Sequence, residues 1–296
     1  MANGNPDVGM MRSAADLVRD CCAESLTALK TYHGRALKLQ AEPIHQMRVG
    51  TRRLRAVLRI FGSLMDAQWA SELEAELRWL AHLLGNVRDL DVLRQRLREA
   101  ARPQDHQALL YLQRVLGTRH RDAQAAMREG LRSERYNALT ERLHAGSLAP
   151  EMALQAGEPA LEALLPPLKS AWKKLARAAG KLKPGDDSLK FHRVRKMAKR
   201  TRYASETLMT DLDSNDRDAA ERFINRMKKL QDTLGELQDA VVASKTIEML
   251  LESNTTHQAG LRGIIKTQER TEKKARAKFA KVWRAANDRK NRKWMK

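Results

Sequence analysis

The sequence contains two copies of a basic motif in which histidine, arginine and lysine recur at helical spacing. The copies span 44–55 and 191–202, and both read His-x-x-Arg-x-x-x-(Arg/Lys)-Arg-x-Arg. On a helix that advances about 100° per residue, the histidine and the recurring cations fall within one stripe about 80° wide. Like charges at this spacing repel one another by about 0.2–0.5 kcal/mol per pair. Two such stripes in one chain predict a site for a polyanion.

The candidate anion-binding residues lie on these two helices and on the helix that ends each half of the chain. Aligning the two ending helices pairs Arg114 with Lys266 and Arg121 with Lys273. The full predicted set is His45, Arg48, Arg52, Arg55, Arg59, Arg114, Arg121, His192, Arg195, Lys199, Arg202, Lys266, Arg270 and Lys273. If the halves pack about a pseudo-twofold axis, these side chains line one shared cleft.

The overall charge supports a polyanionic ligand without identifying it. The 296 residues include 56 Lys and Arg against 36 Asp and Glu, which gives a formal net charge of +20. Such an excess attracts nucleic acid, anionic membranes or inorganic phosphate polymers. The chain has only five Trp, four Tyr and four Phe. So few stacking platforms argue against single-stranded nucleic acid as the main ligand.

The cysteines and the hydropathy pattern predict a soluble cytoplasmic protein. Cys21 and Cys22 are neighbours within a helical stretch, where two thiols are badly placed to bridge each other. A reduced compartment follows from this usage. No run of about 18 apolar residues predicts a membrane span, and residues 1–12 lack an apolar stretch of signal-peptide length.

Helical periodicity covers nearly the whole sequence and predicts an all-α fold. A second motif, Leu-x-x-x-Leu-Gly-x-x-(Arg/Gln)-Asp, also occurs twice, at 80–89 and 230–239. Two halves with the same order of motifs predict two four-helix bundles related by approximate twofold internal symmetry. We expect a disordered N-terminus at 1–12, a first bundle at 13–145, a linker at 146–158, a second bundle at 159–287 and a basic C-terminal tail at 288–296. Ser13 and Asp16 predict a capping box at the first helix.

The duplicated motifs resemble those of the CHAD family, the conserved-histidine α-helical domain. The resemblance runs from about residue 13 to residue 287 and is more specific in the first copy, because the second has Lys199 and Gln238 where the family pattern has arginine. It implies paired helical bundles that bind long-chain inorganic polyphosphate in a basic central cleft, and association with polyphosphate granules in the cytoplasm. Glu72, Glu74 and Glu76 alternate inside a helical pattern with no following lysine, so the triphosphate tunnel signature found in some relatives is missing.

Two arginines and two aspartates are expected to hold helices together and not to contact ligand. Arg53 and Arg200 sit about 80° from the histidines, toward the apolar side of their helices, where an unpaired guanidinium is costly. We therefore expect structural ion pairs between Arg53 and Asp89 and between Arg200 and Asp239. Gly85, in the same motif as Asp89, is expected to allow close packing or a kink, as is its counterpart Gly235.

Other functions remain open from the sequence. One is nucleic-acid binding or bridging of granules to DNA, with weak nonspecific binding expected in any case. Another is a metal-dependent polyphosphate or triphosphate hydrolase with the metal on Asp89 and Asp239. No nucleophile and base recur at catalytic spacing, and the eight histidines do not cluster as metal ligands. We therefore expect no enzyme activity, no cofactor and no metal. Whether His45 and His192 contact the ligand or support the fold is undecided at this stage.

Overall fold

The described part of the chain is all α-helical, as the sequence predicts. The computed structural model describes residues 12–153, 157–252 and 256–295, and these contain no β-strand beyond two isolated bridges. The helices are α1 (Ala14–Leu37), α2 (Ala41–Phe61), α3 (Ala67–Ala100), α4 (His106–Arg132), α5 (Glu134–Leu148), α6 (Ala160–Gly180), α7 (Ser188–Leu208), α8 (Ser214–Leu251) and α9 (Gln258–Ala286). Short 3-10 helices include η4 (Met209–Asp211) and η5 (Arg289–Met295).

Local signals in the sequence locate several helix ends well. Ser13 caps α1, and both hydrogen bonds of the expected capping box to Asp16 are present. The first basic helix begins at Ala41, two residues before Pro43. α5 continues to Leu148, into the segment expected to be a linker. The expected disorder at 1–12 concerns residues that, apart from Arg12, lie outside the described part.

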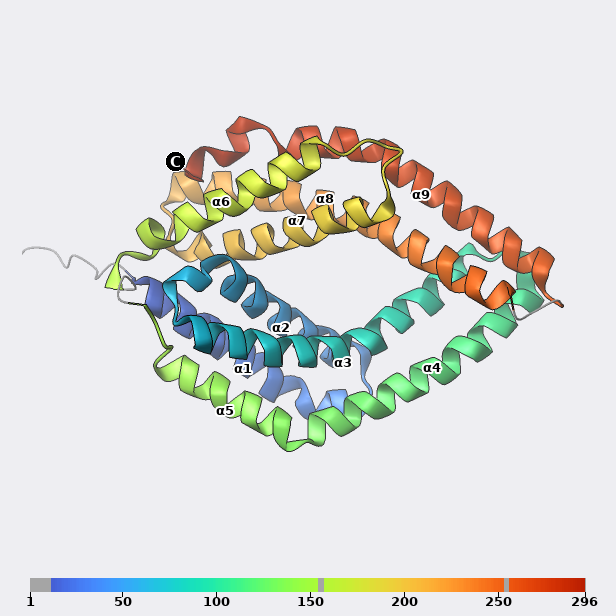
Figure 1. The fold of residues 1–296 in the computed structure, drawn as a ribbon, viewed down its shortest axis with the longest axis horizontal. Coiled ribbons are helices and arrows are strands. Elements are labelled where there is room, and N and C mark those ends of the chain that lie inside the picture. The colour runs from blue at the N-terminus through green and yellow to red at the C-terminus, as the bar shows by residue number, and fades with distance from the viewer. Residues whose placement is uncertain (1–11, 154–156, 253–255, 296) are drawn as a thin grey trace, which may run out of the picture.

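The helices form two halves that face each other and meet at both ends (Figure 1). One half contains α1 to α5 and the other contains α6 to α9. At one end α2 packs on α7 while α1 contacts α6; at the opposite end α4 packs against α9 and α3 against α8. The approximate twofold relation between the halves stays a prediction.

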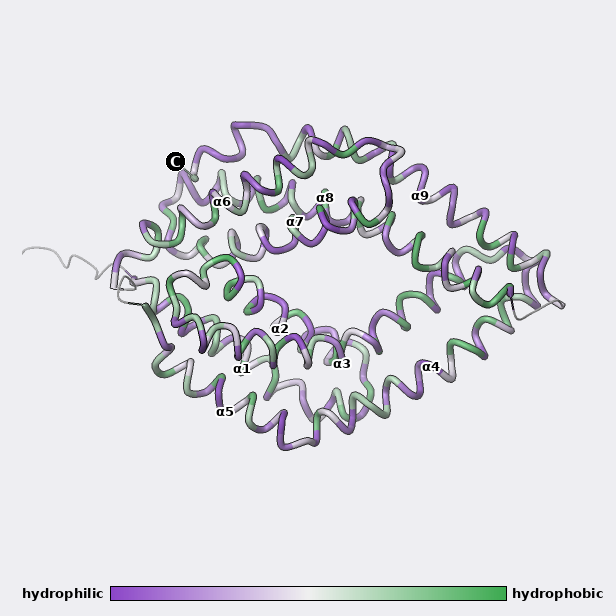
Figure 2. Tube along the Cα trace, in the orientation of Figure 1, coloured by the Kyte–Doolittle hydropathy of each residue, from purple (hydrophilic) through white to green (hydrophobic). Residues whose placement is uncertain are grey.

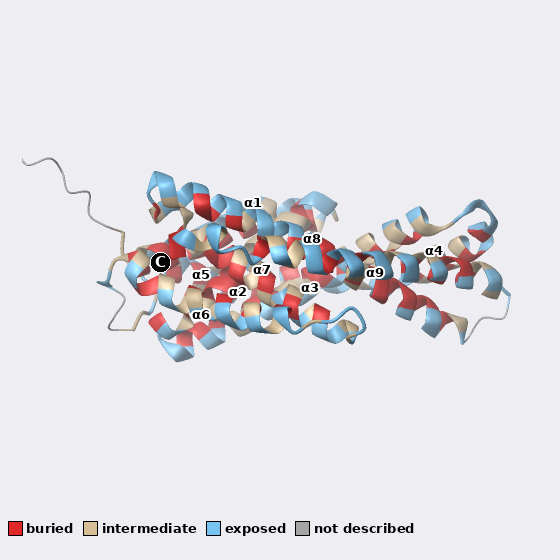
Figure 3. Cartoon of the chain, turned by 90° about the horizontal axis from the view of Figure 1, so that it is seen from above, coloured by how far each residue is buried: buried red, intermediate tan, exposed pale blue. Residues whose placement is uncertain are grey.

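Two separate apolar clusters join the halves. The larger one is built around side chains such as Phe61, Leu77, Phe191 and Phe223. The smaller one lies where α3 and α4 meet α8 and α9; its fully buried members include Leu97, Leu112, Leu116, Ala243, Ile247, Leu261 and Ile264. It fills the narrow end of the molecule in Figure 3.

Helix length explains why the clusters are separate. α3 has 34 residues and α8 has 38, whereas α2 and α7 have 21 each. At a rise of about 1.5 Å per residue, α3 and α8 are therefore about 20 Å or more longer than the basic helices beside them. They reach past α2 and α7 to the second cluster. In Figure 2 a hydrophilic stretch of α7 lies toward the middle of the view, between the two ends where the halves meet.

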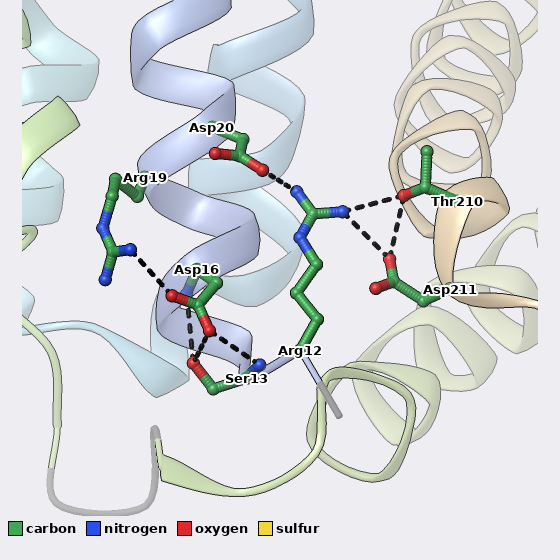
Figure 4. Close-up of polar contacts among 7 residues, drawn as sticks. All are labelled: Arg12, Ser13, Asp16, Arg19, Asp20, Thr210 and Asp211. Carbon is green, nitrogen blue, oxygen red and sulfur yellow. Dashed lines mark hydrogen bonds and ion pairs between the residues drawn. The ribbon is translucent and has the colours of Figure 1, made fainter. Parts of the chain in front are cut away.

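Arg12 ties the start of α1 to the second half of the chain (Figure 4). Its Nη1 donates to Thr210 Oγ1 at 2.8 Å and to Asp211 Oδ2 at 3.3 Å, both on η4. Its Nη2 pairs with Asp20 on α1. One guanidinium therefore bridges the two halves at the end formed by the larger cluster.

The basic tail expected at 288–296 folds back onto the second half. It forms η5, in which Trp294 and Met295 are buried although the segment carries several cations. The Trp294 ring meets Phe223 of α8 edge to face, with centroids 5.9 Å apart, and Arg292 lies over the ring of Trp172. These contacts make the tail part of the core.

We predict that Trp294→Ala lowers the free energy of unfolding by about 3 kcal/mol, because truncating a buried aromatic ring leaves a cavity. Urea unfolding followed by circular dichroism measures the change. Lys293→Ala, one residue earlier and exposed, is the matched control and should stay within about 0.5 kcal/mol of the parent. Equal effects of the two substitutions would contradict the packing of η5.

Candidate anion-binding site

A cavity of about 330 Å³ lies between the two basic helices and the two long helices beside them. α2 and α7 face each other here, flanked by α3 and α8. The lining residues are Arg48, Arg52, Asp89, Val92, Leu93, Arg96, His192, Arg195, Lys199, Gln238, Asp239 and Val242. Each of the four helices contributes at least two of them, so the site exists only when both halves are folded together.

Several nitrogen atoms around this cavity are buried and have no hydrogen-bond partner in the described part of the chain. They are Nε of Arg52, Nε of Arg195 and Nδ1 of His45 and His192. Nearly all buried polar groups in proteins are paired, and a missing partner costs about 1–3 kcal/mol. A group of such nitrogens on two facing helices therefore marks a candidate site for a ligand that carries hydrogen-bond acceptors.

The glycines of the second motif hold the guanidinium groups of the first motif. A Cβ atom built on Gly85 would lie 3.7 Å from Nε and Nη2 of Arg48, and one built on Gly235 would lie 3.6 Å from the same atoms of Arg195. Both arginines therefore rest against the backbone of a long helix. The sequence predicted close packing at these glycines; the structure shows that an arginine head group makes the approach, in both halves alike.

Burial and mutual repulsion keep part of the cluster uncharged at neutral pH. Burial, followed by the charges of Arg52 and Arg195, lowers the pKa of Lys199 to about 6. Burial also lowers the pKa of His45, which lies near Arg88, and that of His192. Without a ligand, these three groups are thus mainly neutral above about pH 7.

The two aspartates in the cavity differ in exposure. Asp89 Oδ1 accepts a hydrogen bond from Arg48 Nη2 at 2.8 Å, and its side chain is 68% exposed. Asp239 is more buried, and burial raises its pKa although Arg195 and Arg96 act in the opposite direction. Arginines in the lining outnumber these carboxylates even before Lys199 and His192 are counted.

The expected ion pairs are wrong in their partners. Arg53 faces the groove between α1 and α7, where its Nη2 lies 3.9 Å from Glu206, and Arg48 takes Asp89 instead. Adjacent residues of a helix point about 100° apart, so Arg52 lines the central cavity while Arg53 faces a different pair of helices.

The second expected pair fails for the same reason. Arg200 lies with Arg59 in a pocket beside α6, whereas Asp239 faces Arg195 across the central cavity. Burial lowers the pKa of Arg200, and the nearest charges that act on it are Arg59, Arg55 and Glu74. No described carboxylate forms an ion pair with it.

The predicted anion-binding residues separate into three groups. Arg48, Arg52, His192, Arg195 and Lys199 line the cavity, and His45 lies close enough to feel the charges of Arg48 and Arg52.

The second group continues the stripes but already has partners. Arg55 and Arg59 both donate to Oε1 of Glu74, at 2.8 and 2.5 Å through their Nη2 atoms. Arg202 pairs with Glu206 and lies 4.4 Å from the ring centroid of Tyr203.

The third group, on α4 and α9, does not line the cavity. Its exposed members are Arg114, Arg121, Lys266, Arg270 and Lys273.

Sequence reasoning missed several residues of the site. Arg96 follows Asp89 by seven residues, which keeps both on one face of α3, so its phase was a usable signal. Its Nε donates to Gln268 Oε1 at 2.6 Å. On α9, Lys274 and Lys278 line the neighbouring pocket that shares Arg195 with the cavity. Neither lysine belongs to the set that we expected on this helix, although Lys274 directly follows the expected Lys273.

Within residues 12–153, 157–252 and 256–295, no three His, Cys, Asp or Glu side chains gather as potential metal ligands. The same ranges hold no helix long and apolar enough to span a bilayer.

Comparison with known proteins identifies the family. The model of the CHAD domain matches residues 20–248, which is most of the chain. The chain belongs to the CHAD family. Two Mycobacterium tuberculosis relatives, the uncharacterized proteins MT2285 and Rv2226, are each 32% identical to it over 260 residues, or 81% of this chain and 47% of theirs. This CHAD chain therefore spans about half the length of the curated relatives that it matches.

Solved structures share the CHAD fold of this chain. PptA from Streptomyces chartreusis superposes with a TM-score of 0.76 and 19% identity, over 92% of this chain and 99% of its own. The CHAD domain from the plant Ricinus communis gives a TM-score of 0.73 and 22% identity, over 97% of this chain and 96% of its own. At these identities the likeness concerns the fold.

A double-mutant cycle should separate the observed ion pair from the expected one. We predict that Arg48→Ala and Asp89→Ala couple by up to about 1 kcal/mol in unfolding free energy, because Asp89 is largely exposed. Arg53→Ala and Asp89→Ala should add within about 0.5 kcal/mol, since they share no partner. Thermal or urea unfolding of the single and double variants gives both values. A coupling above about 1 kcal/mol between Arg53 and Asp89 would restore the original pairing.

Proposed function

We propose that this CHAD chain binds inorganic polyphosphate as a binding module without catalytic activity. The observation that carries the proposal is a set of buried nitrogens with no hydrogen-bond partner among the described residues. Those of Arg52, Arg195 and His192 belong to residues that line one cavity, and that of His45 lies near the same arginines. Phosphate oxygens accept charge-assisted hydrogen bonds from such donors. The family resemblance points to the same ligand class.

The shape and chemistry of the cavity favour a slender phosphate chain over nucleic acid. Its lining includes no Phe, Tyr or Trp from the described residues, so bases find no stacking platform. The only apolar lining residues are Val92, Leu93 and Val242. A linear anion with an acceptor oxygen on every repeat can instead place phosphates against both α2 and α7.

Electrostatics supply most of the proposed affinity. A phosphate polymer carries condensed counterions, and cationic side chains that replace them release those ions to solution. Binding therefore weakens as salt is added. A net charge of +20 also speeds the encounter with any polyanion. In the cell, this activity suits a cytoplasmic protein that associates with polyphosphate granules.

The carboxylates give a hydrolase less support than a binding site. Asp89 Oδ1 accepts a hydrogen bond from Arg48, and the charges of Arg195 and Arg96 act on Asp239, so both carboxylates lie among guanidinium groups. We therefore place both residues in the electrostatic frame of the site.

We predict that Arg48→Ala/Arg52→Ala and Arg195→Ala/Lys199→Ala each weaken polyphosphate binding at least about tenfold, which corresponds to about 1.4 kcal/mol. Each pair removes donors from one wall of the same cavity, and a polymer held by both walls loses its effective concentration at the other. Fluorescence anisotropy with labelled long-chain polyphosphate at fixed salt measures the loss.

The matched control is Arg119→Ala/Arg132→Ala, which removes two exposed arginines of α4 that do not line the cavity. It should change affinity less than about threefold. Competition by duplex DNA at equal phosphate concentration tests the nucleic-acid alternative in the same assay. If either double variant of the cavity binds polyphosphate as tightly as the parent, or if duplex DNA at equal phosphate concentration displaces polyphosphate, the proposed site is wrong.

We predict that affinity falls as pH rises from about 5 to 8. The free protein holds the pKa of Lys199 at about 6 and those of His45 and His192 below their ordinary value. Bound phosphate favours the protonated forms and raises these pKa values, so binding takes up protons between the free and bound values. Calorimetry in buffers of different ionisation enthalpy measures the uptake.

Lys199→Arg gives this prediction a specific control, because an arginine stays charged across the range. The variant should bind more tightly than the parent at pH 8 and take up fewer protons. His45→Gln/His192→Gln should remove a further part of the uptake. A pH profile unchanged in both variants would assign these residues to the fold alone.

A further inference from the structure

Lys199 lines the cavity, and its amine can act as a nucleophile as well as a cation for binding phosphate. It lies on α7, partly buried, and lines the cavity with Arg48, Arg52 and Arg195. No described carboxylate forms an ion pair with its ammonium group. Its amine therefore faces a space surrounded by guanidinium groups.

We propose that Lys199 is a site of non-enzymatic acylation by small acyl phosphates, with the neighbouring arginines docking the phosphate group of the reagent. The inference goes beyond polyphosphate binding and does not depend on it. It joins two features of one cavity: a nucleophilic nitrogen on α7, and donors on α2 and α7 that fit a phosphate.

The charged and titratable groups around this amine are mainly arginines, which favour its neutral form and attract an anion, while two carboxylates act in the opposite direction. The groups are Arg48 and Arg52 from α2, His192, Arg195 and Arg202 from α7, Asp89 and Arg96 from α3, and Asp239 from α8. Burial and four of these arginines lower the pKa of Lys199 to about 6. At pH 7 such an amine is mainly neutral, whereas an ordinary lysine is almost entirely charged.

The reaction balances without a further reagent. The lone pair of Nζ attacks the carbonyl carbon of the acyl phosphate, and a C–N bond forms. The bond between that carbon and the bridging oxygen breaks, and inorganic phosphate leaves with the electron pair while the nitrogen gives up a proton to solvent. The product is an N-acyl lysine, which carries no charge and no longer supplies an ammonium group to the cavity.

The geometry also places the leaving group. An acyl phosphate is a mixed anhydride whose anionic end seeks paired donors, and Nε of both Arg52 and Arg195 is buried without a partner. Lys199 lines the same cavity as these two arginines, so a reagent docked on them shares that cavity with the amine. Holding reagent and amine together in this way raises the effective concentration of the reaction.

The test is site-resolved acetylation of the full chain with acetyl phosphate at pH 7, measured by mass spectrometry of tryptic peptides over time. Lys199 should react at least about tenfold faster than Lys30, an exposed lysine of α1. Between pH 7 and 9 the rate at Lys199 should level off, while that at Lys30 climbs about tenfold per unit. Lys199→Arg confirms the assignment of the modified peptide.

A second reagent separates docking from simple amine reactivity. Acetic anhydride has no phosphate, so the preference for Lys199 over Lys30 should be smaller with it than with acetyl phosphate. Inorganic pyrophosphate should slow acetylation by acetyl phosphate at Lys199 and not at Lys30. Arg195→Gln should reduce the preference more with acetyl phosphate than with the anhydride, and the pyrophosphate result stands even if this variant is unstable.

Two results would overturn the inference. One is a rate at Lys199 no greater than that at Lys30 with acetyl phosphate. The other is an equal preference with both reagents and no effect of pyrophosphate, which would mean a reactive amine without phosphate docking. Neither result bears on polyphosphate binding, which the affinity measurements decide separately.

Discussion

The guanidinium groups of α2 and α7 repel one another, and the other interactions in the molecule must stabilise the fold against this repulsion. Burial, together with the charges of Arg52, Arg195 and Arg48, lowers the pKa of Lys199 beside them. Ion pairs with Glu206 of α7 and with Asp89 and Glu74 of α3 offset part of this repulsion. Apolar packing contributes the rest of the stability, in the larger cluster at one end and in the smaller cluster between α3, α4, α8 and α9 at the other.

The repelling cations and the apolar clusters lie in different parts of the molecule, and this explains why α3 and α8 are longer than α2 and α7. α3 and α8 have to run past the basic helices because the second apolar cluster must lie beyond the cations, where both halves can reach it. The same two helices supply Gly85 and Gly235, on which Arg48 and Arg195 rest. Each long helix thus supports an arginine in the cavity and also anchors the far end of the frame. The cavity is a product of the whole fold and of no single motif.

The sequence predicted features that depend on the spacing of residues along one helix. It did not predict contacts that depend on how two packed helices are rotated relative to each other. The stripes of α2 and α7 follow from spacing alone, and five of their residues do line one cavity. The partner of Asp89 could not be read in this way, because Arg48 and Arg53 compete for it and only the packing of α2 on α3 selects Arg48. The cations of α9 show the same limit, because Lys274 lines the pocket next to the cavity while its exposed neighbour Lys273, which we expected, does not. The burial of Trp294 had no signal in the surrounding basic segment. The ligand class came from the family resemblance, since charge and spacing indicate only a polyanion.

The joining of the halves on both sides of the cavity has a consequence for which polyanions it can admit. Because the two halves are joined at both ends, the cavity has little freedom to open, and a polymer that enters it has to bend instead. Duplex DNA keeps its direction over about 150 base pairs, and its rigid cylinder cannot fold its phosphates into a space of about 330 Å³. An inorganic phosphate chain has single bonds at every link and no side groups to obstruct it. If this cavity is the polyphosphate site, as we propose, the flexibility of the polymer, more than its charge density, determines which polyanions it selects.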